Sequence, residues 1–340
     1  MDLTTKYLGL TLAHPIMPGA SPLCDTLDGC RRLEDVGAAA LILRSVFEEQ
    51  LTREELGIVH DLFVDEASDA EMLRSFPEPA EFAFSPDRYL EHVRRVKAAV
   101  GVPVIGSLNG TARAGWLAFA QQIEQAGADA VELNIYHVAT DPAETGTDVE
   151  RRLLDAVRQL KWAVRIPVAV KLSPFFSSVS NLACELDALG ADGLVLFNRF
   201  YQPDIDPEML LAAPRLQLSS PDELLLRVRW LAILYGRVEA SLAATGGVHT
   251  GVDALKSVMA GAHAVQVVSA LLERGLAYLP EMTRELTRWL ERREYESLRD
   301  VQGKVSLLQS RNAEAFERGN YMRILQSWRP RGASRAVKSS

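Results

Sequence analysis

Lys171 is the residue of this sequence whose chemical role is easiest to argue. It lies near the end of IPVAVKL (166–172), a stretch that is otherwise apolar. An ammonium group among apolar side chains is costly to bury unless it meets an anion or an electron-rich ligand, or pairs with an acid. Lys171 therefore either faces a ligand at the end of a strand or belongs to a buried ion pair.

Two glycines, Gly246 and Gly247, suggest a phosphate site. They lie in ATGGVHTGVDA (244–254), between an apolar stretch and the start of a helical pattern. Glycine lets the backbone approach a ligand, and exposed N–H groups together with the positive end of a helix favour an anion. VVSA (267–270) would supply further N–H groups. The alternative is a tight turn that binds nothing.

Three more polar residues follow apolar stretches at Asn134, His137 and Asn198. The amides both donate and accept hydrogen bonds in one plane, which suits a flat heterocycle, although either could instead cap a loop. The imidazole titrates near neutral pH and could remove a proton from a substrate. A purely structural or pocket-lining role for His137 stays open.

Eight apolar stretches alternate with helical patterns and must position these residues. Four of them share a joint in which a glycine ends a helix and a strand follows. The predicted strands are 14–19, 36–43, 102–108, 126–134, 166–172, 189–198, 240–247 and 260–268. The predicted helices are 27–36, 86–99, 112–125, 148–164, 178–189, 221–235, 250–260 and 278–292. Strands that are apolar throughout indicate a parallel sheet covered by helices.

A (β/α)8 TIM barrel is the simplest closure of such a sheet, with a doubly wound open sheet as the competitor. LTTKYLGLTLAHP (3–15) is typical of an N-terminal hairpin that plugs the bottom of the barrel. Insertions at 44–85 and 199–220 would form its rim. We predict one barrel domain over residues 1–310, a helical extension at 311–328 and a disordered basic tail at 329–340.

Composition narrows the class of protein. The 340 residues are 48% hydrophobic and carry a formal net charge of −8, which argues against nucleic acid or an anionic membrane as partner. Neither the three cysteines nor the six histidines show the spacing of metal ligands, so we predict no metal site. The N-terminus has no long apolar core typical of a signal peptide, and we expect a cytoplasmic protein.

The motifs together resemble the FMN-dependent dihydroorotate dehydrogenases and the related flavin domain of dihydropyrimidine dehydrogenase. HPIMPGAS, VELN, VAVKL, ATGGVHTGVDALKSVMAGAHAVQVVSALLERG and YESLRDVQGKV carry the resemblance, in the family's order. It implies an FMN-filled barrel mouth, in which Lys171 stabilises the anionic reduced flavin and is catalytic together with His137. The implied cofactor residues are Ala20, Ser21, Arg44, Ser45, Asn134, Lys171, Phe197, Gly246, Gly247, Val268 and Ser269. The implied substrate residues are Arg44, Asn134, Asn198 and Arg199.

The sequence departs from the family pattern at several of these positions. Arg44 replaces a lysine, and NIYHVA replaces NLSCPN, so that His137 takes the place of the catalytic base and Ala139 that of an asparagine which grips the substrate. The asparagine-bearing substrate loop has no clear counterpart in 44–85. These changes leave the substrate open.

The resemblance predicts an oxidoreductase that acts on a carbon–carbon bond next to a carbonyl, in dihydroorotate or a dihydropyrimidine-like substrate. Hydride would pass to flavin N5 while His137 takes the proton. Electrons would leave to a soluble acceptor or a partner oxidoreductase, and the family implies a homodimer. The alternatives are a non-catalytic flavin-binding subunit of a larger oxidoreductase, and a flavin-free phosphate-binding lyase or isomerase that uses Lys171 as a nucleophile.

Overall fold

A computed structural model describes residues 1–47, 85–110, 115–199, 202–213, 216–311, 316 and 319–327. Most of the predicted insertion at 44–85 and the whole of the predicted tail at 329–340 lie outside the described residues. A helix, α12 (Gly319–Ser327), lies within the predicted extension at 311–328.

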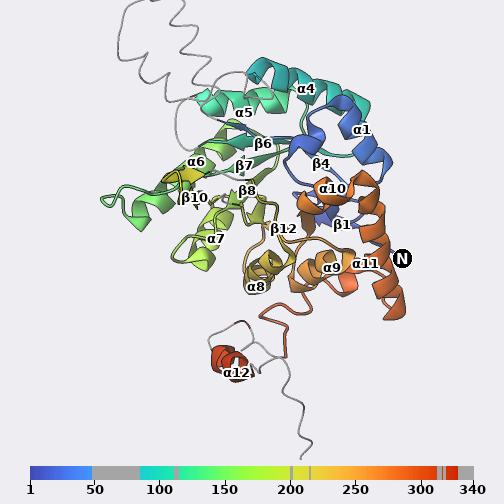
Figure 1. The fold of residues 1–340 in the computed structure, drawn as a ribbon. Coiled ribbons are helices and arrows are strands. Elements are labelled where there is room, and N and C mark those ends of the chain that lie inside the picture. Colours follow the sequence, from blue (N-terminus) through green and yellow to red (C-terminus); the bar gives the residue numbers. More distant parts are fainter. Residues whose placement is uncertain are drawn as a thin grey trace, which may run out of the picture.

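Eight parallel strands form the centre of the molecule (Figure 1). They are β3 (Ile16–Pro18), β4 (Leu41–Ile42), β6 (Val104–Asn109), β7 (Ala130–Asn134), β8 (Val168–Leu172), β9 (Gly193–Leu196), β12 (Ser241–Thr245) and β13 (Ala264–Val267). Their spatial order follows the chain order, and β13 returns to pair with β3. The Ala39 N–H donates to the Ile16 carbonyl at 3.3 Å and joins the first strand to the second. The ring is therefore nearly closed, which confirms the predicted barrel and excludes the doubly wound sheet.

Helices between the strands cover the outside of the ring (Figure 1). They are α1 (Leu27–Asp35), α4 (Pro86–Ala99), α5 (Gly115–Gln125), α6 (Gly146–Ala163), α7 (Val179–Ala188), α8 (Leu224–Leu234), α9 (Gly251–Ala260), the short α10 (Ser269–Arg274) and α11 (Leu279–Arg292). The helix predicted at 148–164 begins two residues earlier, because Thr145 and Asp148 form a capping box. The stretch 221–235 divides into a 3-10 turn, Pro221–Glu223, and α8.

The predicted hairpin closes the bottom of the barrel. Its strands are β1 (Thr5–Tyr7) and β2 (Leu10–Leu12), which pair antiparallel. Tyr7 and Leu8 are buried with the inward-facing side chains of the barrel strands. The Leu8 N–H donates to Ser241 Oγ at 3.2 Å and the Thr5 hydroxyl to the His263 carbonyl at 2.8 Å. The hairpin thus fills the interior from below, which leaves the opposite end, at the carboxyl ends of the strands, as the expected ligand-binding face.

Loops at the carboxyl ends of the strands form the rim. β5 (Val46–Phe47) pairs with the end of β6. A second hairpin, β10 (Asp204–Asp206) and β11 (Leu211–Ala213), occupies the described part of the insertion predicted at 199–220.

Candidate active site

A cavity of about 530 Å³ lies at the carboxyl ends of the barrel strands. All eight strand ends contribute to its wall, as expected for the ligand-binding face of such a barrel. Twelve of the fourteen predicted site residues line it, namely Ala20, Ser21, Arg44, Ser45, Asn134, Lys171, Asn198, Arg199, Gly246, Gly247, Val268 and Ser269. The barrel therefore brings together residues from positions 20 to 269 of the chain.

Lys171 lies on the cavity wall and forms a buried ion pair, the second of the two arrangements predicted for it. Its Nζ donates to Glu132 Oε1 at 3.1 Å and to Gln266 Oε1 at 3.2 Å. Gln266 also lines the cavity, whereas Glu132 lies behind it with no exposed surface. The ammonium is held at the wall by two acceptors while remaining accessible to a ligand.

Asn134 is fixed by two serine hydroxyls. Its Nδ2 donates to Ser107 Oγ at 2.9 Å and to Ser45 Oγ at 3.0 Å, and these hydroxyls lie 2.7 Å apart. Among the described residues, none donates to Asn134 Oδ1. The side chain can therefore present its carbonyl oxygen to a ligand in the cavity.

The turn after β12 has the backbone conformation that the glycines predict. Gly246 and Gly247 adopt φ of +86° and +80°, and a Cβ on Gly247 would lie 2.3 Å from the Leu224 nitrogen. Glycine is thus required here by both conformation and space. Within the described part of the chain, no group accepts a hydrogen bond from the N–H of Gly246, Gly247 or Ser269. These three donors fit the phosphate of a ligand.

Arg227 supports this turn from behind. Its guanidinium donates to the Thr245 carbonyl at 3.0 Å and to the Glu223 carbonyl at 2.8 Å, and a Cβ on Gly246 would lie 3.0 Å from it. The side chain is buried, and burial lowers the pKa of Arg227, with Glu223 opposing that shift. Arg227 therefore fixes the turn and adds positive charge beside it.

Charges around the cavity occur in pairs. Arg44 lies 2.9 Å from Asp25, and Arg199 and Arg227 lie 3.4 and 3.8 Å from Glu223. Burial raises the pKa of Asp25, although Arg44 opposes the shift, and Asp25 Oδ1 is buried without a partner among the described residues. Lys171 and Glu132 form a further such pair, so each of these four cations lies beside a carboxylate of the described part of the chain.

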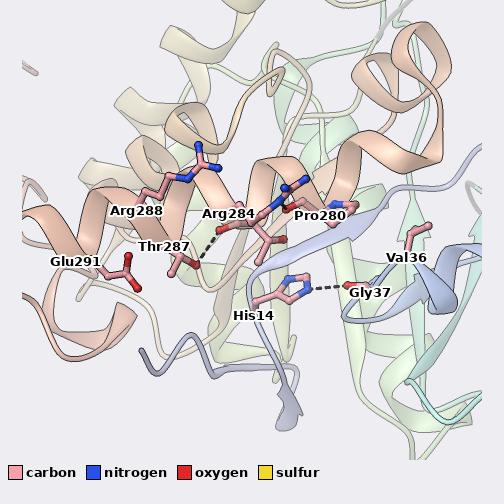
Figure 2. Close-up of a pocket in the computed structure, with 9 residues that line it drawn as sticks. His14, Val36, Gly37, Pro280, Arg284, Thr287, Arg288 and Glu291 are labelled. Carbon is pink, nitrogen blue, oxygen red and sulfur yellow. Dashed lines mark hydrogen bonds between the residues drawn. The ribbon is translucent and has the colours of Figure 1, made fainter.

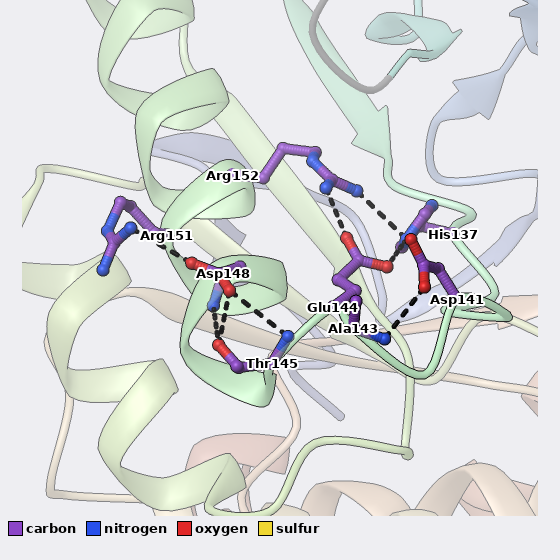
Figure 3. Close-up of polar contacts among 8 residues, drawn as sticks. All are labelled: His137, Asp141, Ala143, Glu144, Thr145, Asp148, Arg151 and Arg152. Carbon is purple, nitrogen blue, oxygen red and sulfur yellow. Dashed lines mark hydrogen bonds and ion pairs between the residues drawn. The ribbon is translucent and has the colours of Figure 1, made fainter.

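His137 lies in a neighbouring cavity of about 780 Å³ and not with the twelve residues above. Figure 3 shows its imidazole directed toward Glu144 and Arg152 on the adjoining loop and helix. His137 Nε2 is 2.9 Å from Glu144 Oε2 and 3.0 Å from an Arg152 nitrogen, and Arg152 also bonds Glu144. Hydrogen bonds from His137 and Arg152 lower the pKa of Glu144. Tyr136 separates the two cavities and lines both.

Phe197 is the other predicted residue that does not line the cavity. Its side chain is fully buried and packs in the core between the strands and the outer helices. The predicted contact between Phe197 and a cofactor is thus not seen on this cavity wall, because the ring turns to the outer side of the barrel.

Several residues of the site escaped the sequence prediction. Glu132 and Gln266 each place a polar side chain in an apolar strand, the same signal that identified Lys171, and could have been found in that way. Tyr136 and Arg227 carry no such signal. An arginine in a helix is ordinarily solvent-exposed, and only the packing of α8 against the turn after β12 buries this one.

A third cavity, of about 450 Å³, lies at the opposite end of the barrel, between α11 and the residues that precede β3 and β4 (Figure 2). His14 lines it. Its Nε2 lies 2.7 Å from the Gly37 carbonyl oxygen, and its Nδ1 accepts from the Ile16 N–H at 3.2 Å. Burial lowers the pKa of His14, although the Gly37 hydrogen bond opposes the shift. Both ring nitrogens hold the chain in place, which is a structural role.

Comparison with known proteins identifies the family of the chain. The family model described as dihydroorotate dehydrogenase matches residues 2–290. The chain is 27% identical over 307 residues to the catalytic subunit of dihydroorotate dehydrogenase B (NAD(+)) of Thermoplasma acidophilum, covering 89% of this chain and 98% of that protein. It is 29% identical over 286 residues to the corresponding protein of Methanocella arvoryzae, covering 80% and 88%.

A further relative is named putative dihydroorotate dehydrogenase A (fumarate), from Aeropyrum pernix. It is 33% identical over 207 residues, which cover 59% of this chain and 67% of that protein. Among the described residues, the helices are all too short or too polar to cross a membrane.

Proposed function

Because the chain belongs to the dihydroorotate dehydrogenase family, we propose that it is an FMN-dependent oxidoreductase acting on dihydroorotate or a related dihydropyrimidine. The bond oxidised or formed is a carbon–carbon bond next to a carbonyl. One observation carries the proposal: a single cavity joins Lys171, the two predicted asparagines and a glycine turn whose N–H groups have no acceptor among the described residues.

The residues of the cavity fit FMN. Its phosphate would accept from the N–H groups of Gly246, Gly247 and Ser269, with Arg227 behind them. Lys171 would donate to the flavin ring, and Ala20, Ser21 and Val268 would lie along it. FMN, when bound, would supply the hydride acceptor at N5. The volume of about 530 Å³ lies in the range of small-molecule sites.

The remaining polar residues of the wall would bind the substrate. Asn134 and Asn198 offer planar donors and acceptors, and Arg44 and Arg199 offer positive charge. We propose His137 as the base, which requires its imidazole to turn from Glu144 toward the cavity that it does not line. Such a turn would exchange the contact with Glu144 for a contact with the substrate.

A second candidate is a flavin-binding subunit that does not oxidise dihydroorotate. The position of His137, held by Glu144 and Arg152 in the neighbouring cavity, favours this candidate. In that case FMN would bind as proposed, and the electrons would come from another substrate or another subunit.

Electrons would leave to a soluble acceptor or to a partner oxidoreductase. Two of the relatives above are named as catalytic subunits, which supports a partner. The rim hairpin β10–β11 exposes Ile205, Leu210 and Leu211, and such apolar side chains suit a protein contact, with a second copy or with the partner.

Anaerobic mixing of the FMN-loaded protein with dihydroorotate tests the proposal. We expect the visible flavin bands to bleach and orotate to appear in equal amount. An Asn198→Ala variant should keep its flavin and require a higher dihydroorotate concentration for the same rate. A protein that binds FMN but is not bleached would support the flavin-binding subunit instead, and a protein that takes up no FMN would exclude both.

A further inference from the structure

Three buried polar side chains form a closed ring in the wall of the cavity. Glu132, Lys171 and Gln266 come from β7, β8 and β13, and their exposed fractions are 0%, 7% and 1%. Lys171 donates to Glu132 Oε1 and to Gln266 Oε1, and Gln266 Nε2 donates to Glu132 Oε2. Each member therefore bonds both others, and both oxygens of the carboxylate are used.

Within the ring, the carboxylate of Glu132 is shielded from solvent and is compensated by Lys171. The residues beside the ring on the neighbouring strands are apolar, since Met17 pairs with Gln266 and Val195 with Lys171. Burial and the charge of Glu132 raise the pKa of Tyr7, so the phenol stays neutral. In the described part of the chain, Lys171 is the cation paired with Glu132. Burying this pair is costly, and the ring geometry offsets the cost.

A ligand in the cavity experiences the charges of Lys171 and Glu132 together. Lys171 and Gln266 line the cavity and Glu132 lies directly behind them. An anion in the cavity meets the ammonium of Lys171 with a carboxylate 3.1 Å further on, so much of the attraction is cancelled. This cancellation hardly changes the binding free energy of a neutral ring system, but it weakens the binding of a ring system that has gained negative charge.

We propose that Glu132 and Gln266 are positioning residues that set how much of the Lys171 charge reaches the bound flavin, and that Glu132 thereby lowers the flavin reduction potential. The inference rests on the proposed function, since it requires FMN in the cavity. Reduced FMN is anionic, whereas the oxidised isoalloxazine is neutral. A negative charge behind Lys171 therefore opposes binding of the reduced form and leaves the oxidised form nearly unaffected. The ring makes the bound flavin a better electron donor to the next acceptor.

Glu132→Gln tests this directly, because it removes the charge and keeps the shape. The measurement is the ratio of the dissociation constants for oxidised and reduced FMN, taken under anaerobic conditions from the midpoint potentials of bound and free flavin. We expect the ratio to change by roughly tenfold or more in favour of reduced FMN, equivalent to a rise of about 30 mV for a two-electron couple. Lys171→Met should change the ratio in the opposite direction.

Glu150→Gln is the matched control. Glu150 is a half-buried acid that lines the neighbouring cavity and bonds only Ser177, at 3.4 Å, within the described part of the chain. The same chemical change there should alter the ratio by less than about twofold, because the charge is outside the ring and closer to solvent.

A second comparison covers the case in which Glu132→Gln does not fold. In that variant a buried ammonium loses its acid, whereas the double variant Glu132→Gln with Lys171→Met contains neither charge. Relative to Lys171→Met alone, the double variant should again favour reduced FMN. Unchanged ratios in the variants that fold would overturn the inference while leaving the proposed function standing. A wild-type protein that takes up no FMN would overturn the proposed function itself.

Discussion

At the scale of single residues, the position of a side chain on its strand decides what it can do. Lys171 faces Asn134 across the β7–β8 ladder, and Glu132 faces Ala169, two residues earlier. The sequence predicted the lysine because a charge in an apolar strand must be compensated. It could not identify Glu132 as the compensating acid, since the pairing depends on register, which one sequence does not reveal.

For His137, the sequence did not predict the direction of the side chain. Its place in the motif predicted a base in the active cavity, but the direction of a side chain on an irregular loop depends on the groups around it. Glu144 and Arg152, seven and fifteen residues further on, bind the imidazole from outside that cavity. The role of His137 therefore stays a prediction.

Substitution of His137 tests that role. We expect His137→Ala to retain FMN and to be reduced by dihydroorotate roughly 10² times more slowly, as expected when a general base is lost. Rapid-mixing absorbance would measure the rate. Glu144→Gln is the companion variant, which loosens the imidazole without removing it and should slow the reaction less. An unchanged rate in His137→Ala would assign proton removal to another group.

At the scale of elements, the sequence predicted all eight barrel strands, because glycine joints and apolar stretches are local signals. Two features of the fold depend on contacts between residues that are distant along the chain. The closure of the ring depends on contact between β3 and β4, and the burial of Arg227 depends on α8 packing beside the turn after β12. Neither follows from the spacing of residues along the chain.

Arg227 gives a prediction about the phosphate turn. Arg227→Met should weaken FMN binding by roughly tenfold or more, because it removes a buried charge and two hydrogen bonds from the support of Gly246. Riboflavin, which has no phosphate, should lose little affinity. Fluorescence titration with both flavins measures the difference. Arg229→Met, an exposed arginine on the same helix, should leave both affinities unchanged, and an equal loss for the two flavins in Arg227→Met would contradict the assigned role.

The hairpin plug gives a prediction about stability. A Cβ on Gly193 would lie 2.5 Å from Leu8 Cδ2 and 3.2 Å from the Ser241 carbonyl oxygen, so Gly193→Ala should displace the buried Leu8 side chain of the hairpin. We expect a loss of about 1–3 kcal/mol in the free energy of unfolding, measured by urea denaturation. Gly146→Ala is the matched control, since nothing lies within 4 Å of its Cβ position. Equal stability of the two variants would show that the hairpin does not pack as described.

At the scale of the whole molecule, the twelve candidate site residues that line the cavity gather at the carboxyl ends of the strands, and the hairpin β1–β2 closes the other end of the barrel. His14 and His263 both lie at that closed end, where each accepts a backbone hydrogen bond. Burial is the largest cause that lowers the pKa of each, against one opposing backbone hydrogen bond. This arrangement could not be predicted from the sequence, because the backbone groups that contact the two imidazoles include Gly37 and Leu242, which lie about twenty residues away along the chain.

These two histidines predict how stability depends on pH. Their folded-state pKa values lie below the ordinary value of 6.5, so the unfolded chain binds protons first as the pH falls. Their contribution is therefore complete above pH 6.5 and is lost below it, by up to about 1.4 kcal/mol per pH unit for each histidine. Urea denaturation between pH 7 and pH 5 measures the slope. A double variant, His14→Asn with His263→Asn, should give a shallower slope, and identical slopes would contradict the prediction.

Titration of the apoprotein with FMN and with riboflavin tests most directly whether the cavity at the carboxyl ends of the strands is an FMN site. We predict one FMN per chain, and riboflavin binding that is roughly 100-fold weaker or more, because riboflavin lacks the phosphate that the N–H groups of Gly246, Gly247 and Ser269 would bind. Equal affinity for the two flavins, or no binding of either, would contradict the proposed site.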